Sequence, residues 1–341
     1  MTPIARPNHP PVPIAELQVW TELAIDDVAV FDKGRNNRVF ILSVGPERFV
    51  LNHYFRDQID SRNRLGHEFG FLEYALAVGI NCVPQPLKRD DARGLGLYQY
   101  LPGRPLKQED IDGGLIQAAG QLLIDLNRHR HGDMAAALPM ASEAAFSLHE
   151  ALKIVERRLH CLGGIETADT VSRAAAAFVR GDLAYAWRDA VGFITATASG
   201  SAVDLDRCLA GWERCLSPSD FGFHNALIGS DGGVNFLDFE YAGWDDPVKA
   251  IADFVLQPEF VLPEGSLDHL VADWLAINEE NQDFLIRLDL LLPVYRIKWC
   301  CIMLNEFLPL GAERRRHAGA DSTDDRKMNQ LGSVDEFTAT I

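Results

Sequence analysis

The sequence lacks an excess of basic residues. It holds 32 Lys and Arg against 49 Asp and Glu, a formal net charge of −17. A surface this negative repels a phosphate backbone and anionic lipid, so binding to nucleic acid or to a membrane surface is a poor hypothesis. Cationic small molecules would be attracted, although solubility alone can account for the charge.

The sequence also lacks long apolar runs and paired cysteines. No segment reaches about 18 uncharged apolar residues, so no membrane insertion is expected. Prolines interrupt the N-terminal stretch where a signal peptide would need an uninterrupted apolar segment. The six cysteines form no CxxC pair and have no histidine at zinc-finger spacing. We therefore expect a cytoplasmic protein with reduced thiols.

What the chain does have is enough apolar sequence for a large core. Its 341 residues, 47% of them hydrophobic, predict about two domains or two lobes that share a cleft. The composition pattern divides the chain into an irregular proline-rich arm (1–18), a strand-rich lobe (19–101), a helical lobe (102–320) and a polar tail (321–341).

The strand-rich lobe is expected to be an antiparallel meander. The segments AVFD, RVFILSV and RFVLNHYF alternate around turn sequences, and GLGLYQYL supplies a further strand. Between them, Leu65, Phe69, Leu72 and Leu76 recur at helical spacing, and Gly79 marks the end of that helix. Helical periodicity then dominates, except over residues 220–240. The predicted fold class is therefore α+β, a small sheet lobe followed by a helical lobe.

The exception holds the most informative pattern. The strand-like segments ALI and VNFLDF flank GSDGG, in which Asp231-Gly232 is a strong signal for a type I′ hairpin turn. With that turn, Asn225 and Asp238 lie opposite each other, with Cβ atoms about 5 Å apart. An amide oxygen and a carboxylate at this separation can share Mg²⁺, which takes few protein ligands and completes its shell with water and phosphate oxygens.

Asp220 lies in the loop that enters this hairpin and can project into the same space. A carboxylate beside a metal pair suits phosphoryl transfer, in which the metal neutralises phosphate oxygens while the carboxylate positions and deprotonates the attacking hydroxyl. The spacing alone is also compatible with a solvated loop and a plain hairpin.

Taken together, these motifs resemble the aminoglycoside phosphotransferases and choline kinases, small-molecule kinases with a protein-kinase-like two-lobed fold. SPSDFGFHN and FLDFEYAGWDDP resemble their catalytic loop and metal-binding segment, and the resemblance runs from about residue 25 to 260. It implies that the chain uses ATP and Mg²⁺, with Asp220 as general base and Asn225 and Asp238 as metal ligands.

The resemblance also implies a nucleotide site in the first lobe. FDKGRNNRVF resembles the turn that covers the phosphates, Glu68 in HEFGFLEYAL stands at the place of the helix glutamate, and YQYLPG resembles the hinge that binds adenine. The implied nucleotide-binding residues are Gly34, Arg35, Asn36, Asn37, Asn52, Glu68, Gln99, Tyr100 and Leu101.

Two positions depart from the family pattern. Asn52 stands where the family has a strand lysine, so the nucleotide side lacks an ammonium group unless His53 or Arg56 compensates. Ser217-Pro218-Ser219 replaces the family's His-Gly before the catalytic aspartate. Asn52 favours an alternative function, a nucleotide-binding pseudokinase with weak or no transfer. The presence of all three of Asp220, Asn225 and Asp238 argues against that alternative. A small-molecule binding module that uses no nucleotide would leave the metal pair unexplained.

The segment after Asp238 indicates the class of acceptor. Only seven residues separate it from Asp246, too few for the activation loop with which protein kinases dock a peptide. A small-molecule acceptor is therefore expected: an aminoglycoside, an amino alcohol or a sugar. Glu240, Asp245 and Asp246 could hold a cationic acceptor, or they could instead cap a helix and interact with solvent. Asp246-Pro247 is typical of a helix start, and Asp253 resembles the family aspartate that holds the catalytic loop by its backbone amides.

Overall fold

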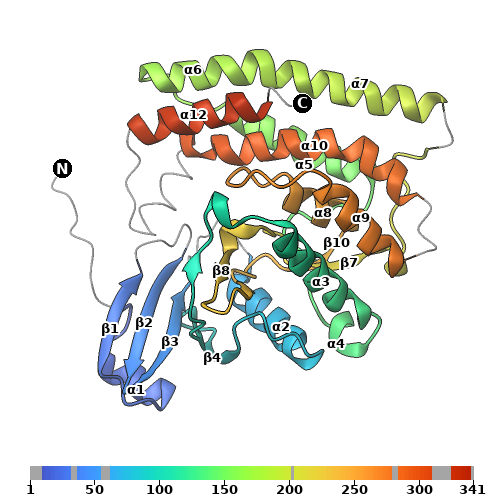
Figure 1. Ribbon diagram of the computed structural model, residues 1–341. Coiled ribbons are helices and arrows are strands. Elements are labelled where there is room, and N and C mark those ends of the chain that lie inside the picture. Colours follow the sequence, from blue (N-terminus) through green and yellow to red (C-terminus); the bar gives the residue numbers. More distant parts are fainter. Residues whose placement is uncertain are drawn as a thin grey trace.

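The computed structural model describes residues 10–31, 37–54, 62–200, 203–278, 283–308 and 324–338. They form a small antiparallel sheet with two helices and a larger, mainly helical part (Figure 1). The predicted α+β architecture, a sheet lobe followed by a helical lobe, is confirmed.

The small lobe is a five-stranded antiparallel sheet with strand order β1-β2-β3-β5-β4. Its strands are β1 (Asp27–Phe31), β2 (Arg38–Val44), β3 (Glu47–His53), β4 (Pro86–Asp90) and β5 (Leu95–Gln99). Because side chains alternate along a strand, the two faces have different partners. One face packs Phe40, Leu42 and Leu51 against Leu17 of α1 (Ile14–Thr21), while Val50 and Tyr98 join the main core on the other face.

The helix α2 (Arg64–Ala77) covers the second face of this sheet and follows the predicted pattern. Asn63 caps its N-terminus by accepting a hydrogen bond from the Gly66 N–H at 3.0 Å. Leu65, Phe69 and Leu72 are buried on its inner side. The helix ends just before Gly79, whose φ of 90° is one that glycine adopts readily.

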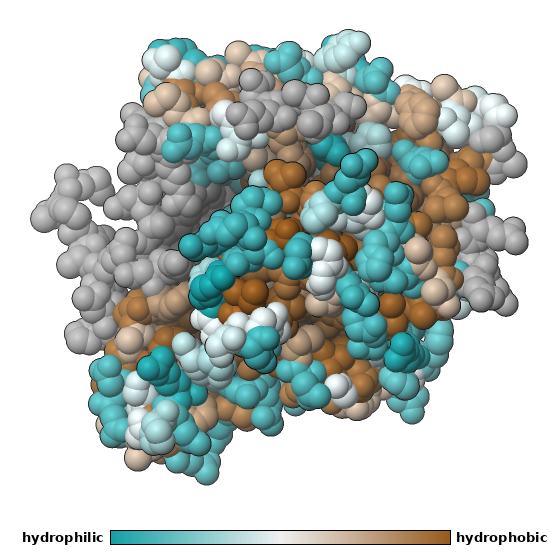
Figure 2. Space-filling model, in the orientation of Figure 1, coloured by the Kyte–Doolittle hydropathy of each residue, from teal (hydrophilic) through white to brown (hydrophobic). Residues whose placement is uncertain are grey.

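The larger lobe is built around α10, which packs against α5, α7, α8 and α12. Figure 1 shows α6 and α7 as one long rod on the outside of this group, joined by a π-helical turn, η2 (Val179–Leu183). The helices are α3 (Gly113–Arg128), α4 (Asp133–Ala136), α5 (Leu148–Leu162), α6 (Thr170–Phe178), α7 (Ala184–Gly200), α8 (Pro247–Val255), α9 (Ser266–Ala276), α10 (Phe284–Leu304) and α12 (Asp324–Thr338). In the view of Figure 2, polar and apolar residues alternate over the coloured surface, and a patch of apolar surface is visible towards the middle.

Two small sheets accompany the helices of the larger lobe. In one, the order is β6 (Arg104–Pro105), β8 (Ala226–Ile228), β9 (Val234–Phe236); in the other, β7 (Cys215–Ser217) pairs with β10 (Gly243–Asp245). The predicted β8–β9 hairpin forms, but its register was predicted wrongly. Leu227 pairs with Asn235, and the Leu237 N–H donates to the Asn225 carbonyl at 2.8 Å, so Leu237 and not Asp238 lies opposite Asn225.

The turn explains the one-residue difference in register. The Gly229 N–H bonds to the Gly233 carbonyl at 2.8 Å, which closes a three-residue loop. In this loop Gly232 has a positive φ of 83°, whereas Asp231 does not, so the two-residue type I′ turn is replaced by a longer turn with glycine at its left-handed position.

Two segments expected to lack regular structure are in part helical. Residues 14–18 of the predicted arm belong to α1, and most of the predicted polar tail forms α12, which packs on α10 and α6. The proposed lobe boundaries remain predictions. Among the described helices, none is long and apolar enough to cross a membrane.

Candidate active site

Asp220 and Asn225 belong to one compact loop between β7 and β8. The Asn225 Nδ2 donates to the Asp220 carbonyl at 3.0 Å, and the Asn225 N–H donates to the Gly222 carbonyl at 3.1 Å. The Asp220 side chain is 33% exposed. Since the amide NH₂ of Asn225 is used within the loop, its oxygen is the atom suited to a metal.

Ser219, directly before Asp220, has a left-handed backbone with φ 67°. Its Oγ donates to the Ser142 carbonyl at 3.2 Å and lies 3.3 Å from the Nζ of the buried Lys249. The resemblance described above would place glycine here, for which this conformation carries no steric cost. In this chain the hydroxyl contacts hold a serine in the same conformation.

Asp238 follows β9 and also has a left-handed backbone, with φ 63°. Burial raises the pKa of its carboxyl well above the usual range, and the negative charges of Glu240, Glu68 and Asp220 raise it further. The four carboxyl groups therefore lie close enough to interact. The hydrogen bond from the Leu237 N–H to the Asn225 carbonyl places Asp238 next to the loop that holds Asp220 and Asn225, although not in the register expected from the sequence.

Glu68 of α2 reaches this cluster from the small lobe. Its carboxylate accepts hydrogen bonds from the hydroxyl of Tyr54 and from the Phe239 N–H, the latter at 3.4 Å. Burial raises the pKa of Glu68 to about 7, against the lowering effect of the Tyr54 hydrogen bond. The predicted helix glutamate is therefore tied to the residue that follows Asp238. Its partner Tyr54 could not be identified from a sequence motif.

Asn52 lies on the face of β3 that carries Val50, directed towards the main core. Its Nδ2 is 3.5 Å from the Tyr54 hydroxyl, and its buried Oδ1 has no hydrogen-bond partner among the described residues. His53 alternates to the opposite face, so it does not compensate for the missing lysine there. Arg56 lies outside the described residues.

Of the predicted phosphate-covering residues, Asn37 is described, whereas Gly34, Arg35 and Asn36 lie outside the described residues. The Asn37 Nδ2 donates to Glu240 at 2.6 Å, and Arg64 Nη1 lies 3.4 Å from the other carboxylate oxygen. Both the asparagine and the glutamate are buried. Glu240 is therefore engaged within the protein and is not presented to a cationic acceptor.

The predicted hinge residues join the two lobes. Gln99 ends β5, with its N–H bonded to the Gln85 carbonyl at 2.9 Å, and the chain continues through Tyr100 and Leu101 to β6. The Tyr100 ring lies under the Arg48 guanidinium at 5.5 Å. The segment therefore has the position expected of a hinge, and its adenine-binding role stays a prediction.

A buried network of charges contacts the loop that contains Asp220, through the 3.3 Å contact between Lys249 and Ser219. Lys249 lies 2.7 Å from Asp245 and 2.9 Å from Asp253, and Lys298 Nζ donates to Asp253 at 2.6 Å. Asp246 caps α8 through the Val248 N–H at 2.8 Å and pairs with Arg287, which confirms the predicted helix start at Pro247. Asp245 and Asp246 are thus engaged internally and do not form a cationic-acceptor site.

The role expected of Asp253 was wrong, because it pairs with lysines and not with loop amides. A different residue has that function: Gln257 Oε1 accepts from the Phe223 N–H at 2.7 Å, and its Nε2 donates to the Phe254 carbonyl at 2.8 Å. Gln257 lies just after α8, and its long-range contact with the loop has no local sequence signal.

The donor set fits a divalent cation. The negative charges of Glu68, Asp220 and Glu240 raise the pKa of Asp238 and the positive charge of Arg64 lowers it, so its surroundings favour a cation. No group of three His, Cys, Asp or Glu among the described residues forms a metal site by itself. Mg²⁺ is held by one or two protein oxygens together with substrate phosphates, so Asn225 and Asp238 suffice.

Comparison with known proteins places this arrangement in a family. The model of the phosphotransferase enzyme family matches residues 27–284, which span both lobes and include every predicted catalytic, metal-binding and nucleotide-binding residue. The chain belongs to this family. A search of curated protein sequences gives no significant match.

Solved structures of family members share the two-lobed, kinase-like fold. A spectinomycin phosphotransferase, solved with ADP and spectinomycin, matches with a TM-score of 0.64 at 12% identity, covering 97% of this chain and 98% of that one. The macrolide 2′-phosphotransferase of Brachybacterium faecium gives 0.57 at 17% identity (91% and 98% covered). The choline kinase of Streptococcus pneumoniae gives 0.57 at 14% identity (96% and 98% covered).

Proposed function

We propose that this phosphotransferase moves the γ-phosphoryl group of ATP, with Mg²⁺, to a hydroxyl of a small molecule. The observation that supports the proposal is the placement of Asp220, Asn225 and Asp238: Asp220 and Asn225 share one hydrogen-bonded loop, and Asp238 follows Leu237, whose N–H donates to the Asn225 carbonyl at 2.8 Å. This is the set of groups that phosphoryl transfer requires.

Each residue then has a distinct role. Asp220 orients the acceptor hydroxyl and takes its proton, while Asn225 and Asp238 hold the metal. A magnesium ion bound there would supply charge neutralisation of the phosphate oxygens. Glu68 fixes the backbone beside Asp238 through the Phe239 N–H. Backbone groups at Gln99, Tyr100 and Leu101 bind the adenine.

The acceptor is a small-molecule alcohol, namely an aminoglycoside, an amino alcohol or a sugar. The connection from Asp238 to α8 is short, and β10 occupies part of it, so no long segment is available there to dock a peptide. The spectinomycin phosphotransferase and the choline kinase that share this fold are named for such acceptors.

Thermal unfolding and turnover together test the proposal. We expect ATP to raise Tm, and Mg²⁺ to increase that effect in wild type but not in Asp238→Asn, because the metal ligand is lost. ADP release from MgATP is then measured with choline, spectinomycin and a set of free sugars. Turnover with one of these that Asp220→Asn abolishes supports the function, whereas equal turnover by the variant contradicts it.

A nucleotide-binding pseudokinase is the second candidate, and the surroundings of Asn52 favour it. On this face of β3 an uncharged amide replaces the lysine, and Glu68 takes its hydrogen bond from Tyr54. For a pseudokinase, ATP would raise Tm without turnover of any alcohol, and Asp220→Ala would change nothing. Absence of stabilisation by any nucleotide would contradict both functions and favour a binding module.

A further inference from the structure

His224 lies four residues after Asp220 and contacts it directly. Its Nε2 is 3.1 Å from the Asp220 Oδ1. The imidazole is 6% exposed, whereas the carboxylate that it contacts is 33% exposed. The buried His224 ring therefore contacts one oxygen of the Asp220 carboxylate, while the carboxylate stays accessible to solvent.

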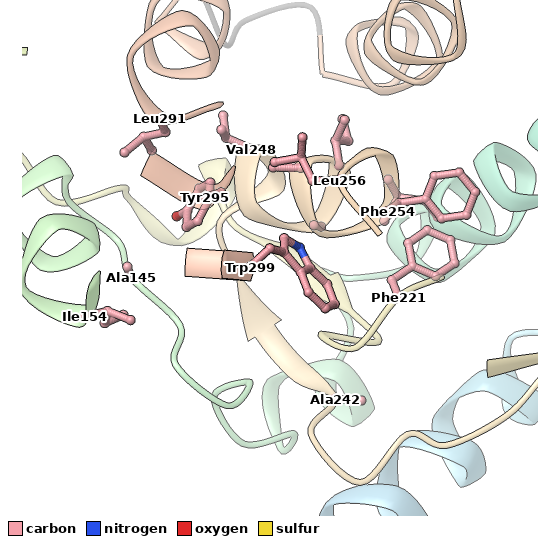
Figure 3. Close-up of a cluster of buried hydrophobic side chains, with 14 of the residues drawn as sticks. Ala145, Ile154, Phe221, Ala242, Val248, Phe254, Leu256, Leu291, Tyr295 and Trp299 are labelled. Atoms are coloured by element: carbon pink, nitrogen blue, oxygen red, sulfur yellow. The ribbon is translucent and has the colours of Figure 1, made fainter. Parts of the chain in front are cut away.

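The surroundings of the ring fix its position. It meets the Trp299 indole edge to face, with ring centroids 6.3 Å apart. A Cβ at Gly222 would lie 2.5 Å from His224 Nδ1 and 3.0 Å from Gln257 Oε1, so only glycine leaves room for the ring there. Figure 3 shows Trp299 in the buried cluster that also contains Phe221 and Phe254, whose rings are 4.7 Å apart.

The hydrogen-bonding pattern identifies the tautomer. An ionised carboxylate only accepts hydrogen bonds, so Nε2 carries the hydrogen. The buried Nδ1 has no hydrogen-bond partner among the described residues, so a hydrogen there would be buried without an acceptor. The ring therefore donates a hydrogen bond from Nε2–H to Asp220 Oδ1.

We propose that His224 is a positioning residue for phosphoryl transfer, which holds the Asp220 carboxylate in the rotamer that receives the acceptor hydroxyl. This inference rests on the proposed function. An aspartate side chain that is one-third exposed would otherwise sample several rotamers, and a displacement of about 1 Å at a reacting group can cost about 100-fold in rate. The role requires a donor at the position of Nε2 and does not require the ring to change charge.

Two substitutions separate the donor from the bulk of the ring. His224→Leu keeps apolar volume and removes the donor, and His224→Gln places an amide NH₂ near the position of Nε2. Turnover of MgATP is measured with choline, spectinomycin or a free sugar, whichever wild type uses. We expect His224→Leu to lower kcat about 10- to 100-fold with the KM for ATP within about twofold of wild type, and His224→Gln to recover most of the loss.

His149 provides a matched control. It forms a similar pair with Asp206, with Nδ1 and Oδ1 2.7 Å apart, but its side chain is 46% exposed and it lies on α5, outside the catalytic loop. We expect His149→Leu to keep the wild-type kcat. If His224→Leu does not fold, Gly222→Ala replaces it, since its Cβ displaces the ring; an unchanged kcat in a folded Gly222→Ala protein would overturn the inference.

The outcomes distinguish the inference from the proposed function. Wild-type turnover with an unchanged kcat in His224→Leu overturns the positioning role alone. Equal losses in His224→Leu and His224→Gln, each matched by a fall in Tm, show a purely structural role and also overturn it. If wild type turns over none of these alcohols, the proposed function fails and the inference fails with it.

Discussion

At the residue scale, the chemistry is flanked by two non-glycine residues with left-handed backbone. Ser219 and Asp238 are two of four such residues among the described part of the chain. Each costs on the order of 1–3 kcal/mol and persists because neighbouring contacts hold it. The contacts of Ser219 with Ser142 and Lys249 hold its backbone in this way. The strained conformations lower the stability of the fold, and they occur next to Asp220 and at Asp238.

Tyr54→Phe tests the contribution of the hydrogen bond between the Tyr54 hydroxyl and Glu68. The change removes the hydroxyl that donates to Glu68 and leaves a buried carboxyl with one donor fewer. We expect the free energy of unfolding in urea to fall by about 1–3 kcal/mol. Tyr185→Phe, at a side chain that is 67% exposed, is the control and is expected to have no effect. Equal stability of the two variants would show that the Tyr54 contact contributes little.

Asn52→Lys tests whether a cation on this face of β3 improves nucleotide binding. Gly96 lies opposite Asn52 with the Tyr98 ring over it, and Asn52 lies near the Tyr54 hydroxyl that donates to Glu68. In the proposed nucleotide site an ammonium group here would face the phosphates. We expect the Kd for MgATP, measured by calorimetry, to fall about 10-fold, the effect of one charge-assisted hydrogen bond. Asn52→Leu is the control. If the lysine and leucine variants bind equally, the nucleotide phosphates do not approach this face.

The sequence identifies the residues of the site that lie in a local motif and misses those defined by long-range contacts. Asp220, Asn225 and Asp238 were predicted as site residues because their spacing along the chain is characteristic. Tyr54 and Gln257 are missed because their partners, Glu68 and the Phe223 N–H, depend on packing between separate elements. Asp253 was assigned to the loop because no pattern shows that Lys249 and Lys298 converge on it.

At the element scale, the hairpin shows how a short loop sets register. Asp-Gly favours a two-residue turn, but GSDGG also contains the glycine that a three-residue loop needs at its left-handed position. The difference shifts the pairing by one residue, which places Leu237 opposite Asn225. Asp238 still reaches the site, because its left-handed backbone redirects the chain immediately after β9.

The start of α8 was predicted correctly, and its cap can be tested separately from its ion pair. Asp246→Ala removes both the cap and the partner of the buried Arg287, and we expect it to cost about 3–5 kcal/mol of unfolding free energy. Asp246→Asn keeps an oxygen for the Val248 N–H and removes only the charge, so its cost should be smaller by about 1 kcal/mol. Chemical denaturation measures both. Equal costs would show that the cap contributes nothing.

A pH-dependent contribution is expected near β6, which extends the hairpin sheet. Asp110 accepts two hydrogen bonds from the Arg104 guanidinium, at 2.6 and 2.7 Å, and these, with the Lys107 N–H, lower its pKa from 3.8 to about 2. The folded state therefore binds this proton more weakly than the unfolded state does. The resulting stability is present above pH 3.8 and is lost as the pH falls through about 2.

Asp110→Asn is the variant that tests this contribution. We expect it to lower Tm at pH 7, with a difference from wild type that shrinks between about pH 4 and pH 2 and is smaller in high salt. Thermal unfolding followed by circular dichroism measures the effect. A difference that stays constant down to pH 2 would assign it to lost packing instead of lost charge.

At the scale of the whole molecule, strand and helix periodicity sufficed to predict a sheet lobe followed by a helical lobe. The alternation in β2 and β3 and the apolar spacing in α2 each reflect burial of one face, which is a local property of the sequence. α12 was missed because its sequence is polar; among its described side chains, Val334 and Phe337 pack into the main core.

In the proposed function, the two lobes together transfer phosphate from ATP to an alcohol. The most direct test is ³¹P NMR of the full chain with MgATP and choline, spectinomycin or a free sugar. We predict a new phosphomonoester resonance that grows as the ATP γ-phosphate signal falls, and that does not appear with Asp220→Asn. If wild type and Asp220→Asn give the same spectra over hours with each of these alcohols, the phosphotransferase account is contradicted.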